Sequence, residues 1–119
     1  MMNDMIQTLF QGFAVDGKEI PVKFLYYIGH GEPYITYQLT DADNSISGDD
    51  GLIGFVDYYD FDIYAKGNYT EIVESVIQIM TNAGWTWQPS RSSGDLYEED
   101  TGYYHRTLQF AYPKEVNYG

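Results

Sequence analysis

Three aspartates in one short stretch come closest to a catalytic arrangement. Asp57, Asp60 and Asp62 lie within one predicted strand, where Asp60 and Asp62 share a face about 7 Å apart. Paired carboxylates at such distances carry out acid–base chemistry in glycosidases. Catalysis also needs a neighbour that orients or tunes the pair, and Lys66 is the single basic residue close by in the sequence. We therefore interpret this face as solvated or as part of an interface, and predict no catalytic residue.

The acidic stretch that begins at Asp41 partly matches a calcium-binding loop. Asp41, Asp43 and Ser45 fall at the first, third and fifth positions of such a loop. The match then fails, because Ile46 stands where a glycine is required and Leu52 where a bidentate glutamate is required. We predict a solvated loop here and no metal site.

Other catalytic and cofactor signatures are missing from the sequence. The chain has no cysteine, which removes thiolate metal sites, iron–sulfur clusters and cysteine nucleophiles. Its two histidines, His30 and His105, are far apart in the sequence, and we expect His105 to form hydrogen bonds at a surface or interface. There is no phosphate-binding loop, dinucleotide fingerprint or nucleophile elbow. The sequence predicts neither a cofactor nor an enzyme.

Tyrosine is the unusual component of the composition, with 13 residues in a chain of 119. Tyrosine is enriched where a surface is apolar yet must stay soluble when free. Those on or beside predicted strands are Tyr58, Tyr59, Tyr64, Tyr97, Tyr103, Tyr104 and Tyr112. We favour a protein interface over the alternative, in which these tyrosines line the edge of the core with hydrated hydroxyls.

The charge balance narrows the class of protein. Eighteen acids against six bases give a net charge of −12, which argues against direct binding of this chain to the phosphates of a nucleic acid. An apolar content of 44% with 18% aromatics excludes disorder, and no stretch approaches the roughly 20 apolar residues of a membrane span. We expect one soluble acidic domain over residues 1–119, made in the cytoplasm. Its charge should oppose self-association until salt or partners screen it.

Periodicity assigns the elements that must position these residues. Apolar spacings of three and four predict helices, alternation predicts strands, and runs of Asp, Asn, Ser and Gly predict loops. In chain order we predict a helix over 2–13, strands over 20–27 and 34–40, a loop over 41–54, a strand over 55–66, a helix over 68–84, a strand over 85–89, a loop over 90–102 and a strand over 103–112. This order, α-β-β-β-α-β-β, indicates an α+β fold: a mostly antiparallel sheet of about five strands with two helices packed on one face.

Four strings stand in a characteristic order and spacing within residues 18–115. They are PYITYQ at 33–38, YYDFDIY at 58–64, NY at 68–69 and DTGYYH at 100–105. Together they resemble the small tail-completion or tail-terminator proteins of long-tailed phages and prophages of low-GC Gram-positive bacteria. The resemblance implies one tail-terminator-like domain that is a structural part of the virion and not an enzyme.

The resemblance also implies partners and a location. Such a subunit forms a ring, expected to be a hexamer, that caps the tail tube and stops addition of the major tail tube protein. It also offers a surface to head–tail connector proteins. The protein would then be found in the tail or neck of the virion, and in the host cytoplasm during assembly, with no membrane and no direct nucleic-acid contact.

Our own reading of alternation and composition selects the interface residues. We expect an exposed strand face, and loops over 41–52 and 90–100 that become ordered on contact with axial partners. The expected interface residues are Tyr58, Asp60, Asp62, Tyr64, Asp41, Asp43, Asp49, Asp50, Tyr103 and His105. The alternatives are another neck component, such as a head-completion or stopper protein, a hydrolytic enzyme that uses Asp60 and Asp62, and an acidic DNA mimic.

Overall fold

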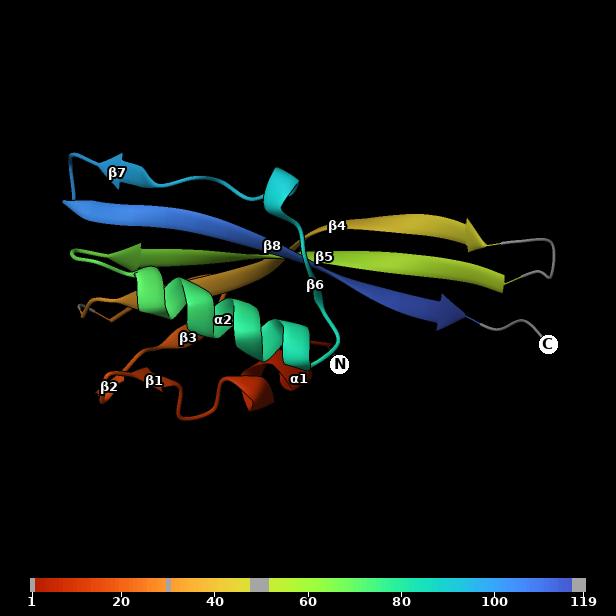
Figure 1. Cartoon of the computed structure of the whole chain (residues 1–119), viewed down its shortest axis with the longest axis horizontal. Coiled ribbons are helices and arrows are strands. Elements are labelled where there is room, and N and C mark those ends of the chain that lie inside the picture. The colour runs from red at the N-terminus through yellow and green to blue at the C-terminus, as the bar shows by residue number, and fades with distance from the viewer. Residues whose placement is uncertain (1, 30, 48–51, 117–119) are drawn as a thin grey trace.

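The computed structural model describes the backbone of residues 2–29, 31–47 and 52–116, and the side chains of residues 4–29, 31–40 and 56–112. Two helices, a short 3-10 turn and eight strands follow one another along the chain (Figure 1). In order they are α1 (Met2–Leu9), β1 (Ala14–Val15), β2 (Lys18–Glu19), β3 (Val22–Phe24), β4 (Tyr34–Ser47), β5 (Leu52–Ala65), α2 (Thr70–Asn82), β6 (Thr86–Trp87), η1 (Pro89–Arg91), β7 (Leu96–Glu98) and β8 (Tyr103–Val116).

The predicted α+β class is confirmed, but the sheet differs in detail from the prediction. It has six strands in the order β3-β4-β5-β8-β6, and β7 also pairs with β8. It is mixed, because β3 runs parallel to β4 while the other pairs are antiparallel. The parallel pair arises because the chain leaves β3 at Phe24 and returns through residues 25–33 to the level where β3 began, so that Val22 pairs with Ile35.

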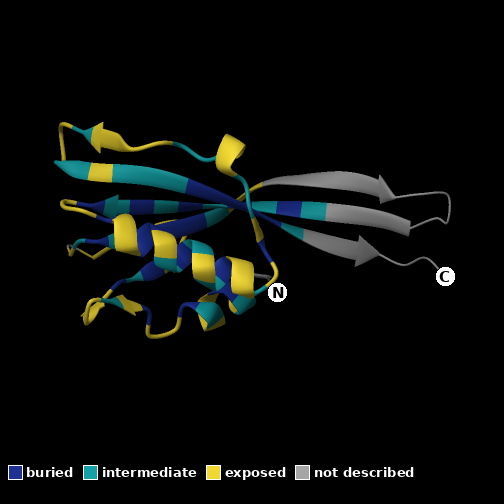
Figure 2. Cartoon of the chain, viewed as in Figure 1, coloured by how far each residue is buried: buried dark blue, intermediate teal, exposed yellow. Residues whose placement is uncertain are grey.

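Both helices lie on one face of the sheet, as the sequence predicts. α1 contributes Ile6 and Phe10 to the core, and α2 contributes Val76 and Met80, among other apolar residues of its inner face. These side chains meet the inward-facing residues of the central strands, of which Phe61 is fully buried. Figure 2 shows the buried positions of α2 turned toward the sheet and its exposed positions turned away. The opposite face of the sheet is left without a helix (Figure 1).

The predicted loop over 41–54 is wrong over most of its length. β4 continues through Ser47 and β5 begins at Leu52, with pairing that reaches from Tyr34↔Tyr64 to Ser47↔Leu52. The ends of β4, β5 and β8 therefore run past both helices as a three-stranded ribbon (Figure 1). The composition of 41–47 is typical of loops, but β5 is an apolar strand held on both sides, and its backbone pairing overrides a weak local preference.

The pairing shifts between Leu39 and Asp41, so that Thr40 is the additional residue of a β-bulge. Beyond such an insertion the alternation of side chains along β4 is displaced by one residue relative to β5. The apolar–polar alternation that predicts a strand over 34–40 therefore changes phase at the bulge and cannot be continued beyond it. This is the local reason why the sequence supports a strand only up to Thr40.

The start and end of α2 also agree closely with the sequence. The carbonyl oxygen of the Asn68 side chain accepts the backbone N–H of Thr70 at 3.0 Å, just before the helix, although no side-chain capping bond forms at Tyr69 itself. Gly84 has φ +95°, the left-handed conformation that ends a helix at low cost in glycine. These two residues fix the length of the helix that covers the sheet.

Candidate functional site

The candidate site is the face of the sheet that carries no helix, which we call the open face. Its residues alternate with the core residues along β4, β5 and β8, and register places them in rows across the three strands. They are Tyr34, Thr36, Gln38 and Thr40 of β4, Tyr58, Asp60, Asp62 and Tyr64 of β5, and Tyr103, His105, Thr107 and Gln109 of β8. The sequence-predicted residues Tyr58, Asp60, Asp62, Tyr64, Tyr103 and His105 thus meet on one surface.

A row of stacked rings crosses one end of this face. Tyr34 stacks on Tyr64 with ring centroids 4.8 Å apart, and Tyr64 stacks on His105 at 4.3 Å. Tyr27, from the segment after β3, continues the row against Tyr34 at 4.9 Å. Tyr103 stands edge-on to both Tyr34 and Tyr64. Because the ring faces are occupied by one another, the row presents its edges and hydroxyl groups outward.

Burial in this row alters the ionisation of its phenols. The pKa of Tyr64 is raised to about 12, first because burial disfavours the phenolate and then because the Asp62 carboxylate repels it. The pKa of Tyr34 is raised for the same leading reason, with Tyr103 and Glu98 adding to it. Both hydroxyls therefore remain neutral hydrogen-bonding groups at physiological pH.

Asp62 is the centre of a hydrogen-bonded group in the next row. Its Oδ1 atom accepts a hydrogen bond from Thr107 Oγ1 at 2.6 Å and lies 3.1 Å from His105 Nε2. The other ring nitrogen, His105 Nδ1, lies 3.7 Å from Glu98 Oε1 of β7. The imidazole therefore connects three strands, β5, β8 and β7. Asp62 and His105 are each less than one-fifth exposed, so this contact is well shielded from water.

Asp60 has a different set of partners. Its Oδ1 atom accepts hydrogen bonds from Gln109 Nε2 at 2.9 Å and from Thr40 Oγ1 at 3.4 Å. Burial raises the pKa of Asp60, the Gln109 hydrogen bond opposes that change, and the charge of Asp62 adds to it. Beside it, the guanidinium of Arg91 lies 3.9 Å above the ring of Tyr58, so that η1 contacts this end of the face.

The positions of Thr107, His105 and the two aspartates match neither a nucleophile–base pair nor the paired carboxylates of a glycosidase. Thr107 and His105 are 3.4 Å apart, as in a nucleophile–base pair, but the hydroxyl of Thr107 already donates to Asp62 and so is not delivered to the imidazole. Asp60 and Asp62 are each bound by protein donors rather than by one another. Within the described part of the chain, no group of three or more His, Cys, Asp or Glu could hold a metal ion. The hydroxyl and carboxylate groups of this face are held by hydrogen bonds to one another and to neighbouring strands.

Of the four acids predicted from the 41–52 stretch, Asp41 and Asp43 belong to strand β4 rather than to the predicted loop. Asp49 and Asp50 lie outside the described residues. The second predicted loop is also structured, because Ser93 N donates to Thr107 O at 3.0 Å and β7 pairs with β8.

Two exposed apolar surfaces lie at the edges of the sheet, and sequence reasoning missed the first. The first follows β3 and contains Phe24, Leu25, Tyr26 and Ile28; the second, beyond β8, contains Leu96, Tyr97 and Tyr104. The first had a signal in the sequence, since an unbroken apolar run over 24–28 exceeds what one half-buried strand can cover. In the second, Tyr97 and Tyr104 belong to the tyrosines for which the sequence favours an interface, whereas Leu96 stands in an acidic stretch and gives no signal.

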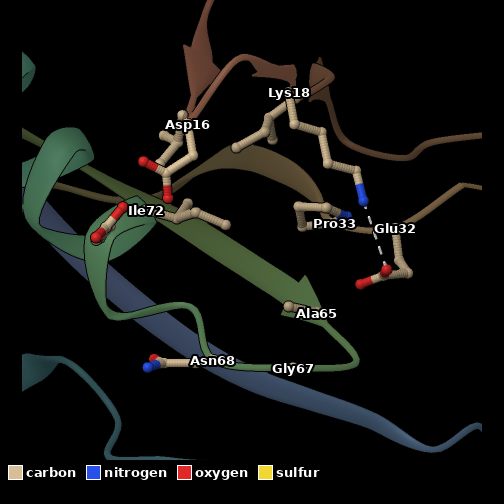
Figure 3. A pocket seen from close by; sticks show the side chains of 11 residues that line it. Asp16, Lys18, Glu32, Pro33, Ala65, Gly67, Asn68 and Ile72 are labelled. Atoms are coloured by element: carbon tan, nitrogen blue, oxygen red, sulfur yellow. Dashed lines mark ion pairs between the residues drawn. The ribbon is translucent and has the colours of Figure 1, made fainter.

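A separate hollow of about 460 Å³ lies between the β1–β2 turn and the start of α2 (Figure 3). Lys18 Nζ lies 3.7 Å from Glu32 Oε1 on one side, and Glu32 Oε2 accepts the backbone N–H of Lys66. The pKa of Glu71 is raised, first by a hydrogen bond shared with the Asp16 carboxyl group and then by the charge of Asp16. This carboxylate pair is open to solvent and has no third ligand.

Comparison with known proteins does not place the chain in a family. No family model matches the sequence, and no curated protein is detectably similar to it. Among the described residues, neither helix is long and apolar enough to cross a bilayer. The resemblance to tail-terminator proteins therefore rests on the sequence strings alone.

Proposed function

We propose that this protein is a non-enzymatic structural subunit of a phage tail, which caps the tail tube as part of a ring and helps to join the tail to the head. The observation that carries the proposal is the open face. It is a broad surface, organised by ring stacking and hydrogen bonds, that neither α1 nor α2 covers. A preorganised surface of this kind loses little conformational entropy when it docks against another protein.

The chemistry of the open face favours a macromolecular partner over a small substrate. Sugar-binding platforms expose the faces of aromatic rings, whereas here Tyr64 is stacked between Tyr34 and His105. The carboxylates of Asp60 and Asp62 are already bound by protein donors. What remains for a partner is a set of ring edges, phenolic hydroxyls and negative charge, which suits a polar protein surface with hydrogen-bond donors. In the proposed role, this face makes the axial contact with tube or connector.

The proposal is tested by electron microscopy of negatively stained tail tubes grown from the major tail protein of the same genome, with and without this protein. We expect tubes to stop growing and to carry a cap at one end. The variant Tyr58→Ala removes one ring of the open face without touching the stacked row, and it should cap poorly. Gln78→Ala, on the outer side of α2, should cap like the natural chain. Tubes that grow unchanged and uncapped in the presence of the natural protein would overturn the proposal, and binding to capsid connectors alone would favour another neck component.

A further inference from the structure

The segment after β3 exposes several large apolar side chains. Leu25, Tyr26 and Ile28 are 53%, 66% and 78% exposed, and they surround a shallow depression of about 530 Å³ with Phe24 and Tyr27. Leu25 has φ +70°, a left-handed conformation that costs a non-glycine residue roughly 1 kcal/mol or more. The backbone is thus held in an unfavourable shape that turns apolar side chains toward water. We call residues 23–29 the apolar hollow.

The opposite edge of the sheet carries a projecting apolar group. Tyr97 of β7 and Tyr104 of β8 pair with ring centroids 4.9 Å apart, and both rings remain more than two-fifths exposed. The chain leading into β7 is fastened, because the hydroxyl of Tyr69 donates to the carboxylate of Asp95. We call Tyr97 and Tyr104 the apolar ridge. It is a fixed shape and not a loose loop.

The hollow and the ridge of one molecule cannot meet. β3 and β7 are separated by β4, β5 and β8, which places them four strand spacings apart, or about 19 Å. Along the strands, β3 pairs with residues 35–37 of β4, whereas β7 pairs with residues 103–105 of β8, of which His105 is in register with Tyr64 and Tyr34. The two edges are therefore offset by about three residues, or about 10 Å. A neighbouring copy placed edge to edge and shifted by about this distance would bring its ridge to the hollow.

The charges at the two edges are opposite in sign. Lys23 is an exposed base at the hollow, on a chain that has only six basic residues. The ridge is followed by Glu98, Glu99 and Asp100, with no base between residues 95 and 100. In a protein of net charge −12, most ways of bringing two copies together place acid against acid. When the hollow of one copy contacts the ridge of another, a base of the first copy instead faces acids of the second.

We propose that the apolar hollow of one copy receives the apolar ridge of a second copy of this chain, so that subunits join head to tail. Two unlike patches on opposite edges form a heterologous contact, which repeats around a ring when the rotation closes. This contact gives the ring of the proposed function its lateral interface, but it stands on the two edges alone and needs no tail tube. The open face remains free for a different partner.

The absence of cysteine in the chain allows a clean test by disulfide trapping. Two single variants, Ile28→Cys in the hollow and Tyr97→Cys in the ridge, are mixed at high salt under mild oxidation, after circular dichroism has shown both to be folded. We expect disulfide-linked dimers in the mixture at several times the yield given by either variant alone. The double variant should form a ladder of covalent oligomers. As a matched control, Ile28→Cys mixed with Gln78→Cys, an exposed position on α2, should give only background.

Two results would overturn the proposal. Equal yields in the test and control mixtures would show that hollow and ridge do not meet, and efficient dimers of either single variant alone would show a symmetric contact instead. Lys23→Glu should lower the trapping yield in the test mixture by several-fold, and an unchanged yield would remove the electrostatic part of the argument. If oligomers are trapped but tail tubes stay uncapped, the proposed tail function is wrong and the contact between hollow and ridge is supported. If tubes are capped but no oligomers are trapped, the contact is wrong and the tail function is supported.

Discussion

Both faces of the central sheet carry stacked aromatic rings, but those of the covered face belong to the core and those of the open face remain partly exposed. On the covered face, Tyr37 stacks on Phe61 at 5.4 Å and Phe61 meets Phe110 edge-on at 5.6 Å, all fully buried beneath the helices. On the open face, Tyr34, Tyr64 and His105 stack just as closely but remain partly hydrated. Ring stacking therefore gives rigidity on both faces, while the free energy of apolar burial is concentrated on one. A surface can be stiff without being part of the core.

The largest effect should come from removing a ring of the covered face. Phe61→Ala leaves a cavity at a fully buried site that contacts Phe10, Tyr37 and Phe110, and should lower the free energy of unfolding by about 3–5 kcal/mol. Urea denaturation followed by tryptophan fluorescence measures this. A loss below about 1 kcal/mol would mean that the two faces do not differ as described.

An intermediate effect is expected at the hydrogen-bonded centre of the open face. Thr107→Val keeps the shape of the side chain but removes the hydroxyl that donates to Asp62, and should cost about 1–2 kcal/mol of unfolding free energy. Thr81→Val is the control, since that exposed hydroxyl lies on α2, away from the open face, and donates to the backbone carbonyl oxygens of Ile77 and Gln78. Equal losses in the two variants would show that the Asp62 group adds nothing to the stiffness of the face.

The smallest effect is a pH dependence at Asp60. Because its folded-state pKa is raised, the folded chain binds more protons than the unfolded chain between the two pKa values. Stability from this group is therefore lost as pH rises through the raised pKa and regained as pH falls. Asp60→Asn removes the charge and can donate to Gln109 Oε1, a buried acceptor that has no hydrogen-bond partner.

We expect Asp60→Asn to be more stable than the natural chain at pH 7, by less than about 1 kcal/mol because the site is partly hydrated. The difference between the two proteins should shrink toward pH 4, when Asp60 in the natural chain becomes protonated. Paired urea denaturation curves at several pH values measure it. If the stability of Asp60→Asn relative to the natural chain instead increased as the pH fell, the raised pKa of Asp60 would be contradicted.

The success of sequence reasoning varied with how local the governing interactions are. Alternation over 34–40, 55–66 and 103–112 separated the core side chains from the open-face side chains, but the pairing of β5 with β8 was needed to bring Asp62 and His105 onto a common surface. The prediction failed for β4 beyond Thr40 and for β7, because those residues are poor strand formers that are held by partner strands. It also missed the apolar edge beside β3, since exposure at an edge depends on which strand is outermost.

By itself, the sequence determined the two helices, the inward and outward sides of the central strands, and a net charge of −12. These follow from periodicity and composition, which each segment carries without its neighbours. Only the tertiary structure decided that β3 runs parallel to β4, that His105 joins three strands, and that β3 and β7 form opposite edges. Strand order and register depend on contacts between distant parts of the chain, and no local pattern encodes them.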